Sequence, residues 1–386
     1  MPYKVEALMT NFTIDSAHLI IASPYHSGSH AAWANGYRIS SQHQVAMLTL
    51  PGRFWKWRMH GGAVSLANQL RHKGWRPRHI LATDMLDLST FAGLLRHDLA
   101  ETQLTLYMHE NQLTYPLPAD PAKGPMRRQH GERDLHYVFI NFSSQLVADR
   151  ILFNSTYHRD SWFAALRAFL RSHPDRRLGH QVDALIAKSD VLPVGLNGAW
   201  LDEAAAEPEP DQPPLILWNQ RWEYDKNPAA FFAALGRAKA AGLPFRLAVC
   251  GENFSRQPEV FAEELPRFRA ELIHEGYADA DTYRRLLWQS DIVISTADHE
   301  FFGISILEAI RCVTYPILPA RLSYPELMPP DLATEILYHD EAELDQLLQT
   351  ALQQPSRRRQ LAQAAAAHVR RYDWAAVAPR YDANFA

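Results

Sequence analysis

The chain has 386 residues, of which 47% are hydrophobic and 21% charged, and its formal net charge at pH 7 is −4. This length allows two domains, each with its own core. No run of eighteen apolar residues occurs, which excludes a membrane-spanning helix, and the N-terminus lacks the pattern of a signal peptide. Only Cys250 and Cys312 are present, too few for a disulfide framework, so we expect buried thiols in a soluble cytoplasmic protein.

The N-terminal half alternates short apolar segments with helical patterns. Strands are predicted at residues 18–22, 44–48, 80–82, 104–107 and 150–153, and helices at residues 62–72 and 139–149. Strands that alternate with helices are typical of a doubly wound α/β domain with a parallel sheet.

An acidic, proline-rich tract at residues 207–214 interrupts this pattern, as a linker would. After it, strands are predicted at residues 215–218, 246–249, 271–274 and 291–295, which indicates a second α/β domain. We therefore predict a first domain at residues 1–199, a linker at 200–214, a second domain at 215–365 and a terminal helix at 366–386.

Charge differs between the two halves. Residues 1–199 hold 21 Lys and Arg against 15 Asp and Glu, whereas residues 200–386 hold 18 against 28. Basic residues alternate with aromatic ones at 53–58 and 71–78, and a further basic stretch covers 123–133. Such stretches suit RNA, through phosphate contacts and base stacking, but also an anionic lipid surface. Alternatively, they are loop charges whose tryptophans pack onto the core.

The loop after the first predicted strand reads Ser27-Gly-Ser-His30. Gly28 allows a substrate to approach the backbone, and Ser29 is placed to cap the next helix. The same residues also suit an ordinary tight turn. We take His26 and His30 as candidates for contacts with the hydroxyl groups of an acceptor.

A second polar loop, His109-Glu-Asn-Gln112, follows the strand predicted at residues 104–107. Ligands of open α/β sheets bind beyond the carboxyl ends of the strands, so His109 and Glu110 are candidates for a site there. The alternative for His109 is a structural, hydrogen-bonded histidine.

Two cations, Arg221 and Lys226, follow the strand at residues 215–218. At the carboxyl end of a strand they can converge on a diphosphate, because Arg supplies a fork of donors and Lys a mobile charge. Alternatively, they are surface ion partners of Glu223 and Asp225.

Two carboxylates, Glu300 and Glu308, bracket a predicted junction between a strand and a helix, with Gly303 at the joint. The start of such a helix offers free N–H groups to a phosphate. The alternative is a solvated loop charge and a surface helix charge. Apolar neighbours argue against this for Glu308, because an unpaired carboxylate among them would cost free energy. The arrangement favours a sugar nucleotide as the ligand.

Together, Arg221-x4-Lys226, Gly251-Glu252 and Glu300-x7-Glu308 resemble the donor half of the retaining glycosyltransferases of family 4. The resemblance implies a GT-B fold, in which two Rossmann-like domains face each other across a cleft and a terminal helix crosses back to the first. It also implies that Arg221 and Lys226 hold the donor diphosphate and that Glu308 binds the ribose. The sugar would be held by Glu300 and the backbone of Phe301, Phe302, Gly303 and Ile304. Base recognition would fall near Gly251 and Tyr277.

The segments 20–33, 50–62 and 107–116 resemble the tRNA-queuosine α-mannosyltransferase family. This implies transfer of mannose from GDP-mannose to queuosine in a tRNA anticodon, with a UDP-sugar as the second candidate donor. Because the sequence has no Asp/Glu-rich metal cluster, and Arg221 and Lys226 can neutralise the leaving diphosphate, we expect no metal ion. His109 and Glu300 would be the catalytic residues. The acceptor would contact His26, Gly28, Ser29, His30, Glu110, Asn111, Arg53, Lys56 and Arg58.

Three other functions stay open at this point. The first is a family 4 transferase that acts on a lipid-linked or polysaccharide acceptor. The second is a non-catalytic protein that binds a nucleotide sugar or RNA, and the third is a nucleotide-sugar epimerase of similar fold. The full set of Arg221, Lys226, Glu300 and Glu308 argues against a pure binding protein, and the basic stretches would be unexplained in an epimerase.

Overall fold

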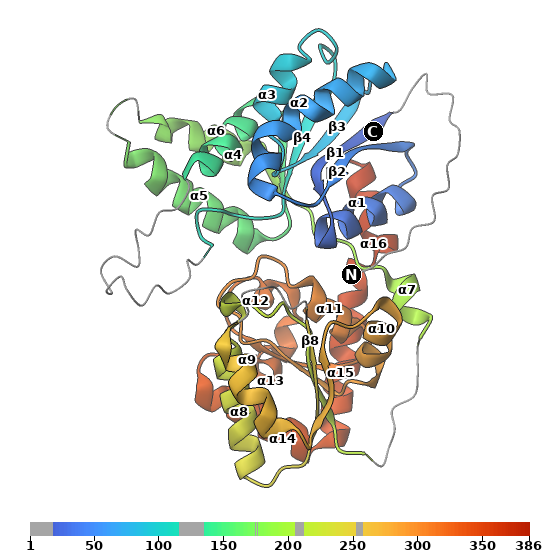
Figure 1. Ribbon diagram of the computed structural model, residues 1–386, viewed down its shortest axis with the longest axis vertical. Coiled ribbons are helices and arrows are strands. Elements are labelled where there is room, and N and C mark those ends of the chain that lie inside the picture. The colour runs from blue at the N-terminus through green and yellow to red at the C-terminus, as the bar shows by residue number, and fades with distance from the viewer. Residues whose placement is uncertain (1–17, 116–134, 174, 176, 205–211, 252–257) are drawn as a thin grey trace. The chain divides into compact units, whose positions relative to one another are not determined.

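The computed structural model describes residues 18–115, 135–173, 175, 177–204, 212–251 and 258–386 (Figure 1). Its described residues form two compact units: an N-terminal unit of residues 18–195 with 374–386, and a C-terminal unit of residues 196–373. These units divide after Gly195 and after Asp373, whereas the sequence-based boundaries lie at 199 and 365. Residues 205–211 of the predicted linker and the basic stretch 123–133 lie outside the described residues.

The N-terminal unit contains a six-stranded parallel sheet with the order β2-β1-β3-β4-β5-β6. Its strands are β1 Leu19–His26, β2 Val45–Pro51, β3 His79–Thr83, β4 Gln103–Met108, β5 Arg150–Phe153 and β6 Ser189–Val191. Its helices are α1 Gly28–Ser40, α2 Trp55–Lys73, α3 Leu88–Leu94, α4 Leu135–Val147, α5 Thr156–Arg171, α6 Gln181–Ala187 and α16 Trp374–Asp382.

The C-terminal unit contains a second six-stranded parallel sheet, with the order β12-β11-β10-β7-β8-β9. Its strands are β7 Leu215–Trp218, β8 Arg246–Cys250, β9 Leu272–Gly276, β10 Ile292–Ile294, β11 Tyr315–Pro319 and β12 Leu337–Tyr338. Its helices are α7 Gly198–Asp202, α8 Pro228–Ala240, α9 Glu259–Glu264, α10 Ala280–Gln289, α11 Ile304–Arg311, α12 Tyr324–Leu327, α13 Ala333–Ile336, α14 Glu341–Gln353 and α15 Pro355–Val369.

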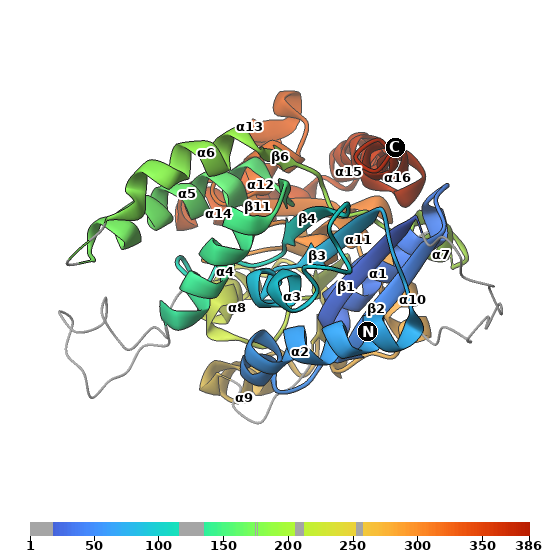
Figure 2. The ribbon, with the colours of Figure 1, turned by 90° about the horizontal axis from the view of Figure 1, so that it is seen from above.

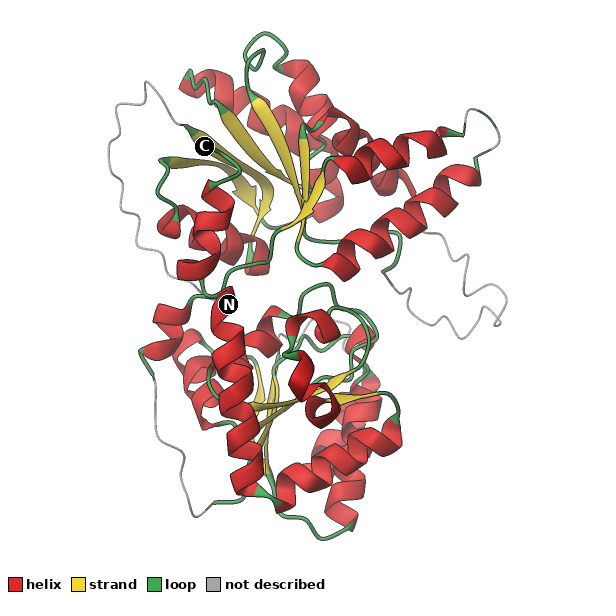
Figure 3. Ribbon diagram, turned by 180° about the vertical axis from the view of Figure 1, so that it is seen from behind, coloured by secondary structure: helices red, strands yellow, loops and turns green. Residues whose placement is uncertain are grey.

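Helices flank both faces of each sheet (Figures 2 and 3), so the central strands are buried and read as continuous apolar runs. All the strands predicted from the sequence are confirmed. The short strands β6, β11 and β12 were not predicted. Among the described residues, no helix combines the length and the apolar character needed to cross a membrane.

Several helices differ from the prediction. Helix α4 covers Leu135–Val147 rather than 139–149, and the terminal helix predicted at 366–386 is divided between the end of α15 and α16, which begins at Trp374. Helix α2 begins at Trp55 rather than at residue 62, so the first basic and aromatic stretch forms its first turn. The pair Gly61-Gly62 has low helix propensity, which is why the sequence did not indicate the earlier start of the helix. Packing explains the second glycine, because a Cβ at Gly62 would lie 2.7 Å from Pro24 Cβ on β1. The prediction that Ser29 caps α1 is wrong, because α1 begins at Gly28 and Ser27 occupies the cap position.

The terminal helix α16 packs against α1 in the N-terminal unit. Trp33 Nε1 donates a hydrogen bond to Tyr381 Oη (2.9 Å), and Tyr37 Oη donates one to Asp382 Oδ1 (2.9 Å). Trp374, at the start of α16, is buried against Gly36 of α1. The chain therefore returns to its first unit at its end, as predicted.

We expect the substitution Gly36→Ala to destabilise the fold. The new Cβ would lie 2.0 Å from Trp374 Nε1, and overpacking of this kind costs about 1–3 kcal/mol of the free energy of unfolding. Thermal unfolding followed by circular dichroism measures the effect. Gly93→Ala on α3 is the matched control, because its Cβ would meet no atom within 4 Å other than those of its chain neighbours and its own helix backbone. A Gly36→Ala protein as stable as the Gly93→Ala protein would contradict this packing.

Candidate functional site

In the C-terminal unit, Lys226 connects the loops that follow two neighbouring strands, β7 and β10. Its Nζ donates to the carbonyl oxygen of His299 (2.7 Å) and to Glu300 Oε2 (3.3 Å), and lies 3.2 Å from Asp225 Oδ2. Lys226 is 5% exposed and Asp225 is 1% exposed. A buried ammonium group is tolerated because two carboxylates pair with it.

Glu300 accepts hydrogen bonds at Oε1 from the backbone amides of Phe301 (3.1 Å) and Phe302 (3.4 Å). Burial alone would raise its pKa, but Lys226, His299 and the Phe302 amide together hold the pKa of Glu300 below its ordinary value. Glu300 is therefore ionised at neutral pH. The next turn of chain enters α11 through Gly303, whose φ of +81° is readily adopted only by glycine.

Glu308 lies in α11 and is 5% exposed. Burial raises the pKa of Glu308 to about 7, although Tyr283 Oη donates a 2.8 Å hydrogen bond to Oε2 and so favours the ionised form. Asn219, after β7, donates from Nδ2 to the same tyrosine oxygen (3.3 Å). The two glutamates thus sit in environments that shift their pKa values in opposite directions, which is common at functional sites.

Arg221 differs from Lys226 in its environment. Its side chain is about half exposed and pairs with Glu223 at 3.3 Å, whereas the Lys226–Asp225 pair is buried. The two ion pairs that the sequence offered as an alternative, Arg221 with Glu223 and Lys226 with Asp225, are therefore both present. Only the first is a surface pair, of the kind that contributes little to stability.

Gly251 and Tyr277, the two residues predicted near the nucleotide base, also have different environments. A Cβ at Gly251 would lie 2.3 Å from Trp222 Cδ1, so packing alone requires a glycine there. The next residue, Glu252, lies outside the described residues. Tyr277 is 51% exposed and is free to contact a ligand.

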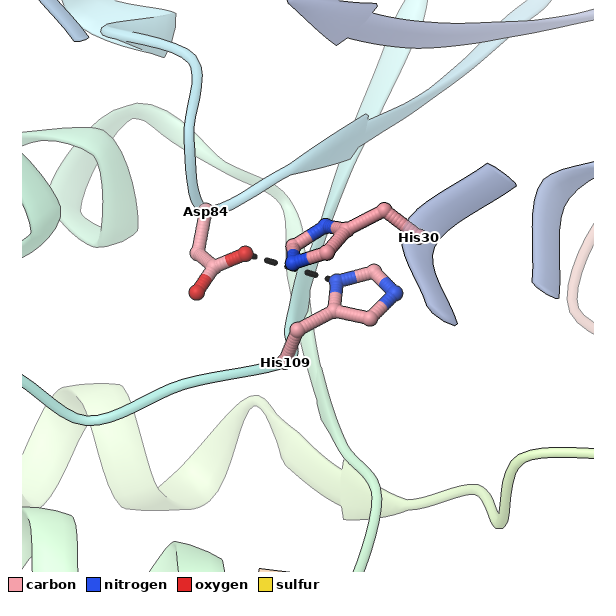
Figure 4. Close-up of side chains that lie close together, drawn as sticks. All are labelled: His30, Asp84 and His109. Carbon is pink, nitrogen blue, oxygen red and sulfur yellow. Dashed lines mark ion pairs between the residues drawn. The ribbon is translucent and has the colours of Figure 1, made fainter. Parts of the chain in front are cut away.

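In the N-terminal unit, His30 from α1 meets Asp84 and His109, which follow β3 and β4 (Figure 4). His109 Nδ1 lies 3.4 Å from Asp84 Oδ1. The rings of His30 and His109 are stacked, with centroids 4.3 Å apart and planes inclined by 29°. All three side chains are more than nine-tenths buried.

The two histidines have different electrostatic environments. Burial and the neighbouring His30 lower the pKa of His109, and Asp84 opposes this only in part. Burial also disfavours charge on His30, but Glu110, with Oε1 4.0 Å from Nε2, and Asp84 raise the pKa of His30 above its ordinary value. The surroundings therefore favour the charged form of His30 and the neutral form of His109.

His30, Asp84 and His109 also have the residue types of a metal site, and their ligand atoms lie within 4.8 Å of one another. They are the one such group in the part of the chain that the structure describes. Two histidines on one tetrahedral ion approach it from different directions, however, whereas these rings are stacked. The stacked arrangement therefore does not suit a metal ion.

The other residues predicted on this side have varied environments. Asn111 is fully buried, and its Oδ1 accepts from the amides of Leu113 (2.9 Å) and Thr114 (3.2 Å), which stabilises the turn after β4. His26 is half-buried with Nε2 3.4 Å from Asn35 Nδ2. Gly28 has a φ of +51°, a left-handed conformation that glycine adopts readily, so the backbone conformation alone accounts for a glycine here. The side chain of Ser29 is exposed.

The basic stretches do not behave alike. In 71–78, Arg71 and Arg76 pair with Asp98 at 3.1 and 2.8 Å, and Trp75 is 7% exposed, so this stretch packs onto the fold. Arg53, Lys56 and Arg58 lie at the start of α2, beside aromatic rings that are exposed.

Sequence reasoning missed Asp84, Tyr283 and Asp225. Asp84 had a usable signal, since a carboxylate directly after a predicted buried strand lies at the edge where ligands bind. Tyr283 had none, because it reaches Glu308 from a separate helix. Asp225 was considered only as a surface partner.

Each of the two units matches the model of a known protein family. Residues 18–196 match the family model "tRNA-queuosine alpha-mannosyltransferase N-terminal", and residues 202–368 match "Glycosyl transferases group 1". The tRNA-queuosine alpha-mannosyltransferase of Drosophila melanogaster is 33% identical over 320 residues, which cover 81% of this chain and 82% of that protein.

Two solved structures have a similar fold. They are sucrose-phosphate synthase from Thermosynechococcus elongatus (TM-score 0.68, 14% identity, 95% of this chain and 98% of that chain) and Anabaena HepE in complex with UDP and glucose (TM-score 0.64, 14% identity, 95% and 99%). These likenesses confirm the predicted GT-B fold with two Rossmann-like units.

The substitution Glu308→Gln tests the raised pKa of this glutamate. A carboxyl whose folded pKa is about 7, against an ordinary 4.5, adds stability below pH 4.5 that is lost as the pH rises through 7. The Glu308→Gln protein should therefore gain stability relative to the unsubstituted protein between pH 5 and pH 8, by about 3 kcal/mol. Urea unfolding at each pH measures it. Parallel stability curves for the two proteins would contradict the shift.

Proposed function

Because the chain belongs to the tRNA-queuosine alpha-mannosyltransferase family, we propose that it transfers mannose from GDP-mannose to queuosine in a tRNA anticodon, with retention of the anomeric configuration. The protein is a hexosyltransferase of the GT-B fold. The proposed reaction takes place in the cytoplasm.

The observation that supports the donor side is the pair of the buried Lys226 with Glu300 just before α11, together with the buried Glu308 within α11. In the proposal, ionised Glu300 and the backbone of Phe301 to Ile304 hold the sugar. Glu308 accepts hydrogen bonds from the ribose hydroxyls, and the base lies near Gly251 and Tyr277. A carboxylate at each end and cations between them match the charge distribution of a sugar nucleotide.

Arg221 and Lys226 have separate roles in this proposal. Lys226 already directs its donors to the His299 carbonyl and to two carboxylates, so it acts mainly by holding Glu300 in place. The half-exposed Arg221 supplies a forked pair of donors to the diphosphate. With the free amides at the start of α11, these cations neutralise the leaving group, and the proposed reaction uses no divalent cation.

His109 is the proposed catalytic residue of the N-terminal unit. A neutral imidazole in a buried setting can orient the sugar and stabilise the oxocarbenium-like transition state without repelling its positive charge. The bond between the sugar C1 and the phosphate oxygen breaks, and a hydroxyl of the queuosine cyclopentene-diol forms the new bond to C1 on the same face. The hydroxyl proton passes to the leaving phosphate, which departs as GDP.

The decisive experiment incubates the protein with queuosine-containing tRNA and a panel of GDP- and UDP-sugars, and then weighs the modified nucleoside by mass spectrometry. We expect queuosine to gain one hexose with GDP-mannose. A gain only with a UDP-sugar would overturn the donor assignment, and no gain with any donor from folded protein would contradict the function.

The substitution Arg221→Ala should raise the KM for the donor by about 10- to 100-fold, because a charge-assisted hydrogen bond to phosphate is lost. Arg221 is suited to this test because its exposed side chain supports little of the fold. Lys226→Ala is not, since it would leave Asp225 and Glu300 buried without their cation.

Initial rates at varied donor concentration measure the effect. Arg269→Ala is the matched control, because Arg269 is more exposed and pairs with Glu275. If Arg221→Ala and Arg269→Ala had the same KM, Arg221 would not contact the diphosphate.

A further inference from the structure

The first turn of α2 presents large aromatic side chains to solvent. Phe54 is 74% exposed and Trp57 is 65% exposed. Adjacent exposed aromatic side chains on a soluble protein usually mark a surface that binds something. The alternative in which the aromatic residues of this stretch pack onto the core is therefore wrong for these two.

The backbone at Phe54 is unusual. Its φ of 55° and ψ of 52° place it in the left-handed region, which costs free energy for any residue with a Cβ. Phe54 is the residue just before α2, and this conformation starts the helix with the phenyl ring outside the core. A strained, exposed phenylalanine is consistent with a functional use of the ring.

Trp57 lies against its own helix and is still largely exposed. A Cβ at Gly61, one helical turn later, would lie 3.0 Å from the indole atoms Cε2 and Cζ2. The indole therefore occupies the space beside Gly61 that the side chain of any larger residue would fill. Because Trp57 is 65% exposed, much of its ring is available to stack on a planar ligand.

Trp55 supports this arrangement from the inner side. Its ring centroid lies 5.1 Å from that of Tyr137 on α4, and Tyr137 is 4% exposed. Lys56 Nζ lies 5.6 Å from the centroid of Trp55 and 6.0 Å from that of Tyr137, within the range of cation–π contacts. The first turn of α2 is thus anchored on α4 while Phe54 and Trp57 face outward.

Charge along this part of the sequence is uniformly positive. The sequence has no Asp or Glu from Ser16 to Thr83, a segment that holds eight Lys and Arg. In the described part of the chain, no carboxylate pairs with Arg53, Lys56 or Arg58. Arg58 Nε donates instead to the Pro51 carbonyl (3.2 Å), which fixes the turn. These cations are complementary to a polyanion.

We propose that Phe54 and Trp57 form a stacking platform for unpaired bases of the RNA acceptor, and that Arg53 and Lys56 contact the flanking phosphates. This inference rests on the proposed function and extends it to the RNA around the modified nucleotide. Single-stranded RNA combines flat π-faces with a phosphate on every nucleotide, which matches aromatic rings interleaved with unpaired cations. An anionic lipid surface is the competing occupant, and the test includes it.

The test measures the affinity of the protein for a fluorescent, queuosine-bearing anticodon stem-loop. We expect the double variant Phe54→Gly/Trp57→Ala to bind it about tenfold more weakly or worse, and to bind GDP normally. Trp57→Phe should retain most of the affinity and Trp57→Leu should not, because stacking requires a planar ring. Ile39→Ala on α1, which also replaces an exposed apolar side chain (69%), is the matched control.

A second variant tests the platform with Trp57 retained. Gly61→Leu fills the seat of the indole with a residue that favours helix, so the protein should fold and still lose stem-loop affinity. Unchanged stem-loop affinity in these variants would overturn the platform. So would weaker binding to phosphatidylglycerol vesicles without weaker binding to RNA.

Failure of the platform is distinct from failure of the proposed function. The mass-spectrometric assay on the unsubstituted protein reports only on sugar transfer, whereas stem-loop affinity reports only on RNA docking. Normal transfer with unchanged affinity in the variants would overturn the platform alone.

Discussion

The candidate site in the C-terminal unit depends on the ion pairs that the buried ammonium group of Lys226 forms. This ammonium group joins the loops after β7 and β10, two neighbouring strands of the sheet, by pairing with Asp225, Glu300 and the His299 carbonyl. Because the pairing is buried, it keeps Glu300 ionised and fixes the entry of the chain into α11. Glu308 follows on α11, where Tyr283 contacts it.

Environment rather than residue type separates the roles of the titratable groups. Lys226 lies beside Glu300 and lowers its pKa, whereas among the described residues Glu308 has no cation beside it of comparable effect and burial raises its pKa, so the two values move apart. The same principle separates the stacked histidines of the N-terminal unit, where Glu110 favours charge on His30 and burial disfavours it on His109. In each unit, therefore, the environment favours the ionised form of one member of a like pair more than that of the other.

The two places where the chain passes between the units lie side by side. The backbone amide of Leu196 donates to the Tyr372 carbonyl (2.7 Å), and buried Arg311 of α11 binds Asp202 and Asp373 with its whole guanidinium group. Through Arg311, helix α11, which also carries Glu308, thus contacts the chain near both of these places. An arginine with two carboxylate partners is well suited to this, because its planar donors fit both partners at once.

Periodicity and spacing in the sequence determined the two α/β domains and most strands of both sheets, and they placed Lys226 and Glu300 at the same edge of the second sheet, where the two side chains pair. They did so because these features follow the chain locally and the carboxyl ends of parallel strands share one edge. Tertiary structure alone decided that Lys226 is buried, that Tyr283 reaches Glu308, and that Asp84 joins the two histidines. Burial and contacts between distant segments set these properties, and neither is encoded in the spacing of residues along one segment.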